Sequence, residues 1–365
     1  MAMKILFYKI LTIFFSSLLA IEACSFLATL ALKNRILTSN PEDYTLSSKE
    51  IESLKNIYDS KLGWDFKEAT KFGERKRAKD YGVDGTITFG DSFTRGDDVA
   101  DECSWQEYLS SHLKHNVFNF GVGGFGVDQA FLKYQLKKKS FPKVKNVILA
   151  FIPGDINRNM NVYRKLIHTF EGGVELTKPY FTLSSENKII LNENPIGSVE
   201  DLSQLQDSDF IRSLMAKDWW HQNHSFPNPQ FPYFRTFLDK NYLSQLREPL
   251  DYEPWFSREG FIILSEILTN FSNEVKLSGA HPLIVFLPDY YFIKGYFEKD
   301  PRRMQTEKIF LQICKDRSLN CQSAVSLFSH KGDREKFFKA EEESSHYSCE
   351  GNKTVAQFLQ NFLKR

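Results

Sequence analysis

Short apolar runs alternate along the chain with segments that mix apolar and charged residues. The apolar runs cover residues 86–89, 116–120, 145–152, 281–287 and 321–327. The mixed segments between them, which have the length of helices, cover residues 105–114, 130–138, 260–277 and 305–314. Strands that alternate with helices are typical of a parallel sheet whose faces are covered by helices. The pattern therefore predicts one α/β domain, which we place at residues 85–365.

This alternation is interrupted between residues 161 and 254. The stretch KPYFTLSSENKIILNENP has the polar turn residues of a hairpin, and a segment dense in Trp, Phe and Pro follows at residues 219–237. We interpret residues 161–254 as an insertion in the α/β domain rather than as a second domain.

The amino-terminal segment is far more apolar than the rest. Residues 10–32 carry one charge, Glu22, and exceed the roughly 20 residues that cross a bilayer. We predict an uncleaved membrane anchor at residues 1–35 with its amino end inside, because a short leading tail stays cytoplasmic. The α/β domain is then extracytoplasmic, in the periplasm or at the cell surface. Residues 36–84 are polar and predict a stalk with a peripheral helix.

Three alternatives to an anchor exist. A cleaved signal peptide is disfavoured, because its apolar core is shorter than the apolar run of residues 10–32. A lipoprotein cleavage box ending at Cys24 is disfavoured, because it would contain the charged residue Glu22 and because apolar residues continue beyond Cys24. A buried core helix is the third alternative.

Composition narrows the function classes. The 365 residues carry a formal net charge of +1 and are 42% hydrophobic, which suits a globular chain and provides no electrostatic case for binding nucleic acid. Cys103, Cys314, Cys321 and Cys349 are an even number of thiols that an oxidising compartment could pair. Cys314 and Cys321 lie seven residues apart and could bridge locally, although sequence leaves the connectivity open and four free thiols are the alternative. The chain has no CxxC pair, and we expect neither a metal nor another cofactor.

The stretch TITFGDSFTRGDD leaves a strand at Gly90 and presents Asp91 and Ser92 at the following turn. In one interpretation these residues are ordinary helix-cap chemistry. In the other, Ser92 is a nucleophile at the carboxyl end of a strand, where α/β sheets place their ligands. The second interpretation requires a base, an orienting acid and an oxyanion site.

Two further stretches supply those groups. In EESSHYSCEGN, His346 follows Glu343 by three residues; alone it would be an ordinary polar side chain, but with Ser92 it completes the residue types of a catalytic triad. In NFGVGGFGVDQA, glycines follow a strand and let main-chain N–H groups approach a ligand closely. A tight turn or a dinucleotide loop are the alternatives, and the latter needs an acidic residue about 20 positions on, which is absent.

The stretches FGDSFTRG, NFGVGGFG, PGDINRN and ESSHYSCEGN together resemble, in order, four blocks of the GDSL-like, or SGNH, hydrolase superfamily, over residues 85–363. The resemblance implies a three-layer α/β/α sandwich around a parallel sheet of about five strands, flavodoxin-like in outline, with the active site at the carboxyl ends of the strands. It also implies Ser92 as nucleophile, His346 as base, the N–H groups of Ser92 and Gly124 as oxyanion donors, and Asp91 and Asp155 as supporting residues.

The chain departs from this family at two positions. Gly154 stands where the third block has an Asn that donates to the oxyanion, so that donor is missing or is replaced by Asn157 or Asn159. Glu343 stands where the family has an Asp, and Glu342 or a backbone carbonyl are alternatives to it.

These features predict a membrane-anchored serine esterase or O-acyltransferase. Its substrates would be ester-linked acyl groups, for example O-acetyl groups of an envelope or exported polysaccharide. The alternative is a non-catalytic, membrane-anchored glycan-binding or assembly protein that has kept the fold with a degenerate site.

Overall fold

The computed structural model describes residues 2–32, 37–66, 68–167, 174–240, 242–243, 252–329, 334–339 and 345–363. They form two compact units. Unit 1 comprises Met1–Ser47, Lys165–Thr169 and Gln204–Leu250, and unit 2 comprises Ser48–Arg164, Phe170–Ser203 and Asp251–Arg365.

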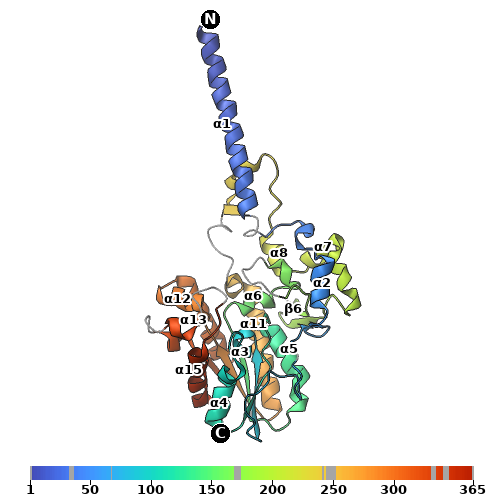
Figure 1. The fold of residues 1–365 in the computed structure, drawn as a ribbon, viewed down its shortest axis with the longest axis vertical. Helices are drawn as coiled ribbons and strands as arrows, with labels where there is room; N and C mark the ends of the chain where they lie inside the picture. The colour runs from blue at the N-terminus through green and yellow to red at the C-terminus, as the bar shows by residue number, and fades with distance from the viewer. Residues whose placement is uncertain are drawn as a thin grey trace. The chain divides into compact units, whose positions relative to one another are not determined.

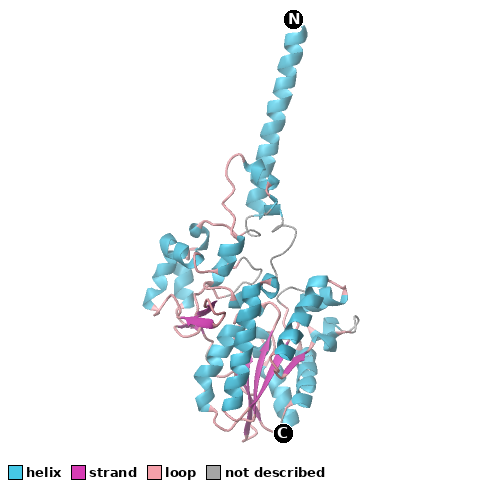
Figure 2. Ribbon diagram, turned by 180° about the vertical axis from the view of Figure 1, so that it is seen from behind, coloured by secondary structure: helices cyan, strands magenta, loops and turns pink. Residues whose placement is uncertain are grey.

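A five-stranded parallel sheet forms the centre of unit 2 (Figure 2). Its strands are β3 (Asp84–Gly90), β4 (Asn116–Asn119), β5 (Asn146–Phe151), β8 (His281–Phe286) and β9 (Cys321–Ser323). They lie in the order β4-β3-β5-β8-β9, which is the 2-1-3-4-5 order of flavodoxin-like folds. The α/β class is therefore confirmed, and each apolar run predicted as a strand contains one. In the run at 321–327 the strand covers only Cys321–Ser323, because the chain then turns into a 3-10 helix.

Helices cover both faces of this sheet (Figure 1). The helices that join successive strands are α4 (Trp105–Leu113), α5 (Val127–Lys137), α11 (Arg258–Leu277) and α13 (Pro301–Asp316). Because the strand order reverses after β4 and crossovers are right-handed, α4 lies on one face and α5, α11 and α13 lie on the other. The last helix, α15 (Cys349–Leu359), packs against α4.

The other elements of unit 2 are short. The predicted hairpin is present as the antiparallel strands β6 (Tyr180–Leu183) and β7 (Ile189–Asn192). The remaining elements of this unit include α2 (Ser48–Leu54), β1 (Tyr58–Asp59), β2 (Gly63–Trp64), α3 (Ser92–Arg95), η3 (Asp101–Cys103), η4 (Lys138–Ser140), α6 (Asp155–Asn159), α10 (Glu253–Phe256), α12 (Tyr290–Phe297), η8 (Val325–Phe328), α14 (Arg334–Phe337) and η10 (Gln360–Phe362).

The core of unit 2 is rich in phenylalanine. Phe89 of β3 stacks on Phe120 with ring centroids 5.3 Å apart, and Phe286 of β8 stacks on Phe310 of α13 at 5.1 Å. All four side chains are buried. Large flat side chains thus fill the space between the sheet and its helices. The polar residues of the candidate site follow the ends of the strands, outside this packing.

Unit 1 contains the long apolar helix α1 (Ala2–Leu32) together with η2 (Pro41–Tyr44), α7 (Ser208–Met215), α8 (Trp219–His224) and η7 (Tyr233–Leu238). Buried Tyr44 donates its hydroxyl to the Thr38 carbonyl oxygen at 3.0 Å and packs its ring edge-on against His221. Within the described residues, Met3–Leu32 is the one span long and apolar enough to cross a membrane, with a mean hydropathy of 2.0.

Candidate active site

Ser92 lies immediately beyond the carboxyl end of β3. Gly90 is the last residue of β3. A side chain has no room there, because a Cβ would lie 2.0 Å from the Ala150 carbonyl oxygen. Asp91 caps α3, since its Oδ1 atom accepts hydrogen bonds from the N–H groups of Phe93 at 3.0 Å and Thr94 at 3.2 Å. Capping is therefore the role of Asp91, and the hydroxyl of Ser92, the first residue of α3, is not used for it.

The glycine-rich loop after β4 lies against this turn. The N–H group of Val122 donates to the Gly90 carbonyl oxygen at 3.0 Å. A Cβ at Gly121 would lie 2.3 Å from the Arg95 backbone nitrogen, so glycine allows the two backbones to touch. Gly124 has a φ of +80°, a conformation that favours glycine.

Unpaired N–H groups occur at Ser92 and within the glycine-rich loop. Among the hydrogen bonds of the described residues, none uses the N–H groups of Ser92, Gly123 or Gly124 as donors. The neighbouring N–H groups of Gly121 and Gly126 are by contrast occupied, by the Asn119 and Gln129 side chains. Free backbone N–H groups at the start of α3 and in the adjoining glycine-rich loop are the kind of donor that an oxyanion site requires.

A buried ion pair supports the end of this loop. Lys178 contacts Asp128 in the first turn of α5, and neither side chain has exposed surface. Asn159 accepts a hydrogen bond from the Asp128 N–H through Oδ1 at 3.2 Å. The Nδ2 atom of Asn159 is buried and has no hydrogen-bond partner within the described residues. In this geometry Asn159 supports the loop, and its amide nitrogen is not accessible to a substrate.

The third block forms α6, directly after β5. Asp155 pairs with Arg158 at 2.5 Å and accepts from the Ile152 N–H at 3.2 Å. Arg158 donates to the carbonyl oxygen of Phe125 in the glycine-rich loop at 2.9 Å. Asp155 and Arg158 thus tie the end of β5 to that loop, and Arg158 was not singled out by any sequence pattern.

Gly154 and Asn157 differ in their surroundings. Gly154 has ordinary helical backbone angles, φ −69° and ψ −17°. Among the described residues, a Cβ added there would meet only the Ile152 Cδ1 atom, at 3.9 Å. Asn157, on α6, is 7% exposed. Glycine is therefore not required at position 154 for conformation or for space.

His346 pairs with Asp98, which the sequence analysis did not identify. The His346 Nδ1 atom lies 2.7 Å from Asp98 Oδ2, and the two side chains are 17% and 56% exposed. The imidazole also packs on Phe93, the residue after Ser92, with ring centroids 4.9 Å apart. Asp98 has a φ of +67°, a conformation that Asp tolerates better than most residues. The acidic pair in TRGDD was the sequence signal that could have found it.

The predicted acid, Glu343, lies outside the described residues, as does its alternative Glu342. Its role therefore stays a prediction.

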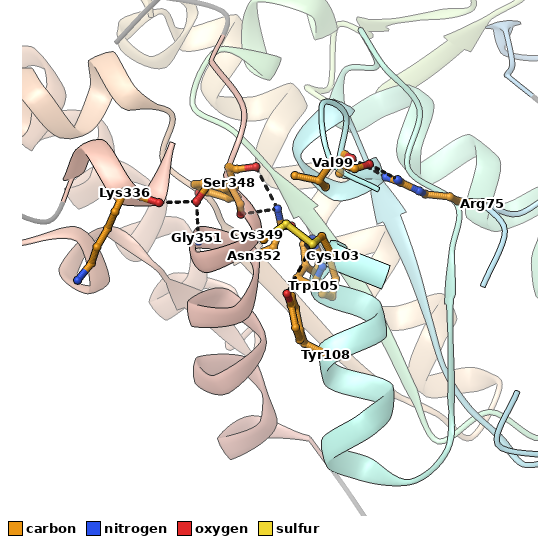
Figure 3. The surroundings of a disulfide bond; sticks show 12 residues. Arg75, Val99, Cys103, Trp105, Tyr108, Lys336, Ser348, Cys349, Gly351 and Asn352 are labelled. Carbon is orange, nitrogen blue, oxygen red and sulfur yellow. Dashed lines mark hydrogen bonds between the residues drawn. A yellow bond between two sulfur atoms is a disulfide. The ribbon is translucent and has the colours of Figure 1, made fainter. Parts of the chain in front are cut away.

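Arg75 holds the loop that carries Asp98. Its guanidinium donates to the carbonyl oxygens of Arg95 at 2.6 Å and Gly96 at 2.5 Å. It also donates to the carbonyl oxygen of Val99 at 2.6 Å (Figure 3). It also pairs with Asp101 at 3.0 Å, and its side chain is 9% exposed. Arg75 lies in the segment predicted from its polarity to be a stalk, and no motif marks it.

A disulfide links the segments that carry Asp98 and His346. Cys103 is bonded to Cys349, the first residue of α15 (Figure 3). Beside it, Asn352 accepts from the Trp105 N–H at 3.2 Å and donates to the Tyr347 carbonyl oxygen at 3.2 Å. The other disulfide joins Cys314 to Cys321. All four cysteines left unassigned by sequence are thus paired.

Comparison with known proteins identifies relatives by structure alone. No family model matches the chain, and no curated protein matches it. A putative lipolytic protein of the G-D-S-L family from Desulfitobacterium hafniense covers 76% of this chain and 99% of its own, with a TM-score of 0.39 and 11% identity. The match to the acetyl xylan esterase AlAXEase covers 76% of this chain and 98% of the esterase, with a TM-score of 0.39 and 12% sequence identity. The match to a lipase/acylhydrolase from Enterococcus faecalis covers 77% of this chain and 98% of that protein, with a TM-score of 0.38 and 11% sequence identity.

The chain is similar in structure to G-D-S-L lipolytic proteins.

Two acids near the candidate site have raised pKa values. Burial raises the pKa of Asp91 from 3.8 to about 6, although Arg158, the Thr94 and Phe93 N–H groups and His346 oppose that rise. Its Oδ2 atom has no hydrogen-bond partner among the described residues. Burial also raises the pKa of Asp97, and Arg95 and His346 oppose it. Among the described residues, no group of three or more His, Cys, Asp or Glu side chains is placed to hold a metal ion.

Proposed function

We propose that this protein is a membrane-anchored serine hydrolase of the SGNH type, in which Ser92, His346 and Asp98 form the catalytic triad. The observation that carries the proposal is the 2.7 Å contact between His346 and Asp98, with the imidazole packed on Phe93 beside Ser92. A cap or a surface histidine would not need this arrangement. The free N–H groups of Ser92 and Gly124 lie on adjoining backbone segments and support it further.

The proposed chemistry gives each of these residues one role. The Ser92 Oγ atom attacks the ester carbonyl carbon while His346 Nε2 takes its proton. Asp98, which accepts from Nδ1, fixes the imidazole tautomer and stabilises the imidazolium. The carbonyl oxygen becomes an oxyanion and accepts from the N–H groups of Ser92 and Gly124. The bond to the leaving alcohol then breaks, the alcohol takes the proton from Nε2, and an acyl-enzyme on Ser92 remains.

The fate of the acyl-enzyme decides the reaction class. If water attacks the acyl carbon, the product is a carboxylic acid and the enzyme is an esterase. If a sugar hydroxyl attacks, the product is a new ester and the enzyme is a transferase. We propose O-acyl groups of an envelope or exported polysaccharide as the substrate, because α1 is long enough to hold the enzyme at a membrane and two disulfides suit an extracytoplasmic site.

A serine-directed fluorophosphonate probe tests the proposal on the full-length protein. We expect the probe to label Ser92, as located by peptide mass spectrometry, and labelling to be abolished by Ser92→Ala and strongly reduced by His346→Ala. Ser213→Ala, an exposed serine on α7, is the matched control and should label normally. Absence of labelling in folded wild-type protein would instead favour a non-catalytic glycan-binding or assembly protein.

A further inference from the structure

One face of α1 is covered along its carboxyl-terminal third. All side chains from Met3 to Ile21 are exposed. The partly or fully covered side chains beyond them are Glu22, Ser25, Ala28, Thr29 and Leu32. Spacings of three and four residues place these five on one side of the helix. Another element of unit 1 therefore packs along this side of α1.

That element is η7. The Glu22 carboxylate accepts hydrogen bonds from the N–H groups of Tyr233 at 2.5 Å and Phe234 at 3.2 Å. The rings of Phe26 and Tyr233 pack with centroids 5.0 Å apart. The first N–H groups of a helix have no partner within it, so Glu22 satisfies the beginning of η7 from outside.

This pairing is suited to a medium that excludes water. A carboxylate inside a membrane helix costs about 3 kcal/mol on an insertion scale. Backbone N–H groups without a partner are also costly in lipid. The contact between Glu22 and η7 satisfies both kinds of group at once, because the backbone N–H groups of η7 form hydrogen bonds with the one charged side chain of the apolar run.

The segment around η7 presents apolar side chains to the surroundings. Phe231 and Leu238 are 77% and 71% exposed. Residues 225–238, SFPNPQFPYFRTFL, carry a single charge, Arg235. The three prolines of this segment have no N–H group to leave unpaired in lipid. Exposed apolar side chains continuous with a membrane-spanning helix are typical of a surface that lipid covers.

We propose that residues 225–238 form a second membrane-contacting element, which lies in lipid beside α1 at the level of Glu22. The occupant of the surface formed by Phe231 and Leu238 is the bilayer itself. This inference rests on the proposed anchor and is independent of the proposed chemistry at Ser92.

Site-specific fluorescence tests this inference on the full-length protein in vesicles of phosphatidylcholine and phosphatidylglycerol. Exposed Cys24 is the one free cysteine among the described residues, so Cys24→Ser provides the background. Phe231→Cys and Leu238→Cys are each labelled with an environment-sensitive fluorophore. Phe14→Cys, in the exposed part of α1, reports the anchor, and Leu277→Cys on unit 2, which is 87% exposed, is the reference outside unit 1.

We expect blue-shifted emission at positions 231 and 238, and a loss of intensity with spin-labelled lipids that position 277 does not show. Glu22→Leu should weaken the quenching at position 231 and leave that at position 14 unchanged. Quenching at position 14 without quenching at positions 231 and 238 would overturn the inference while the anchor stands. Blue-shifted labels that lipid does not quench would show a protein neighbour instead, and would also overturn it. No quenching at any position would refute the anchor as well, whereas probe labelling at Ser92 is decided separately.

Discussion

At the scale of single residues, the candidate site combines local capping with one long-range contact. Asp91 caps α3 and leaves the Ser92 hydroxyl unused, while His346 reaches Asp98 across 248 residues of sequence. Each of these roles makes a different prediction, because a cap, an orienting acid and an oxyanion donor affect stability and turnover in different ways.

Asp98→Asn should lower the kcat for simple acyl esters by about 100- to 10,000-fold, because an amide cannot stabilise the imidazolium. Esterase kinetics measure the effect, and Asp97→Asn is the matched control. Asp97 pairs with Arg95 at 3.3 Å rather than with His346, so we expect its loss to cost much less. Near-normal turnover in Asp98→Asn together with a collapse in Glu343→Gln would transfer the orienting role to Glu343.

Gly154→Asn should fold like the wild-type protein, because position 154 has helical backbone angles and open space. We expect it to raise kcat by up to about 100-fold, the worth of one oxyanion donor. The reason is that Asn159, one of the two proposed substitutes, is committed to Asp128. Thermal melting measured beside the kinetics is the control for folding. A fall in kcat at unchanged melting temperature would mean that Asn157 already fills the position.

Asp91 should make stability depend on pH. Burial raises its pKa from 3.8 to about 6, so the folded state holds a proton that the unfolded state has lost between about pH 4 and pH 6. The free energy of unfolding therefore falls through this window as pH rises. Asp91→Asn keeps a capping oxygen without the charge, and above pH 6 it should be more stable than wild type by on the order of 1 to 3 kcal/mol.

Urea unfolding of both proteins from pH 4 to pH 8 measures this difference. A difference between them that does not change with pH would show that Asp91 does not titrate in this window.

At the scale of elements, the site depends on how the segments that carry Asp98 and His346 are joined. Arg75 holds the first segment through three carbonyl oxygens, and the disulfide between Cys103 and Cys349 ties it to the start of α15. The disulfide lies outside the strand and glycine-loop framework around Ser92, whereas Arg75 also donates its own N–H to the Asn119 carbonyl oxygen at the end of β4, at 2.9 Å. The position of the imidazole should therefore be separable from the fold of the sheet.

The paired variant Cys103→Ser/Cys349→Ser should lose both stability and turnover, because it frees the segments that carry His346 and Asp98. The control is Cys314→Ser/Cys321→Ser, which opens a bridge between α13 and β9. These bridges span 246 and 7 residues, for which the chain-entropy expression assigns about 5 and about 2 kcal/mol. Melting temperature and kcat distinguish the pairs, and equal loss of turnover in both would argue against a positioning role.

At the scale of the whole molecule, the candidate catalytic residues and the apolar helix belong to different compact units. Ser92, Asp98 and His346 all lie in unit 2, whereas α1 lies in unit 1 with η7. The chemistry and the membrane attachment are therefore expected to be separable by truncation.

Removal of residues 1–35 should change the protein from one that only detergent extracts into one that alkali or high salt releases from the membrane, because residues 225–238 keep a peripheral contact with lipid. Its esterase activity should be retained, because no candidate catalytic residue lies in the removed segment. Fractionation followed by ester assay measures both outcomes, with the full-length chain as control. Full-length protein recovered in the soluble fraction would contradict the anchor. Loss of activity in a folded fragment would show that unit 1 contributes to the site.

The sequence by itself determined the features that depend on neighbouring residues. Apolar runs are recognisable because each strand is buried on both faces along its own length, and these runs located all five strands of the sheet. Ser92 and the glycine-rich loop could be placed at strand ends for the same reason, since a glycine after an apolar run marks the point where the backbone must turn.

Only the tertiary structure decided the partners that are distant in sequence. The contact of His346 with Asp98, the support from Arg75, the pairing of Cys103 with Cys349 and the contact of Glu22 with η7 each join residues whose local sequence is ordinary. A charge or a thiol carries no local record of its partner. Its choice depends on which surfaces the packed helices and loops bring together, and the physical reason is that burial selects whichever nearby group can satisfy it.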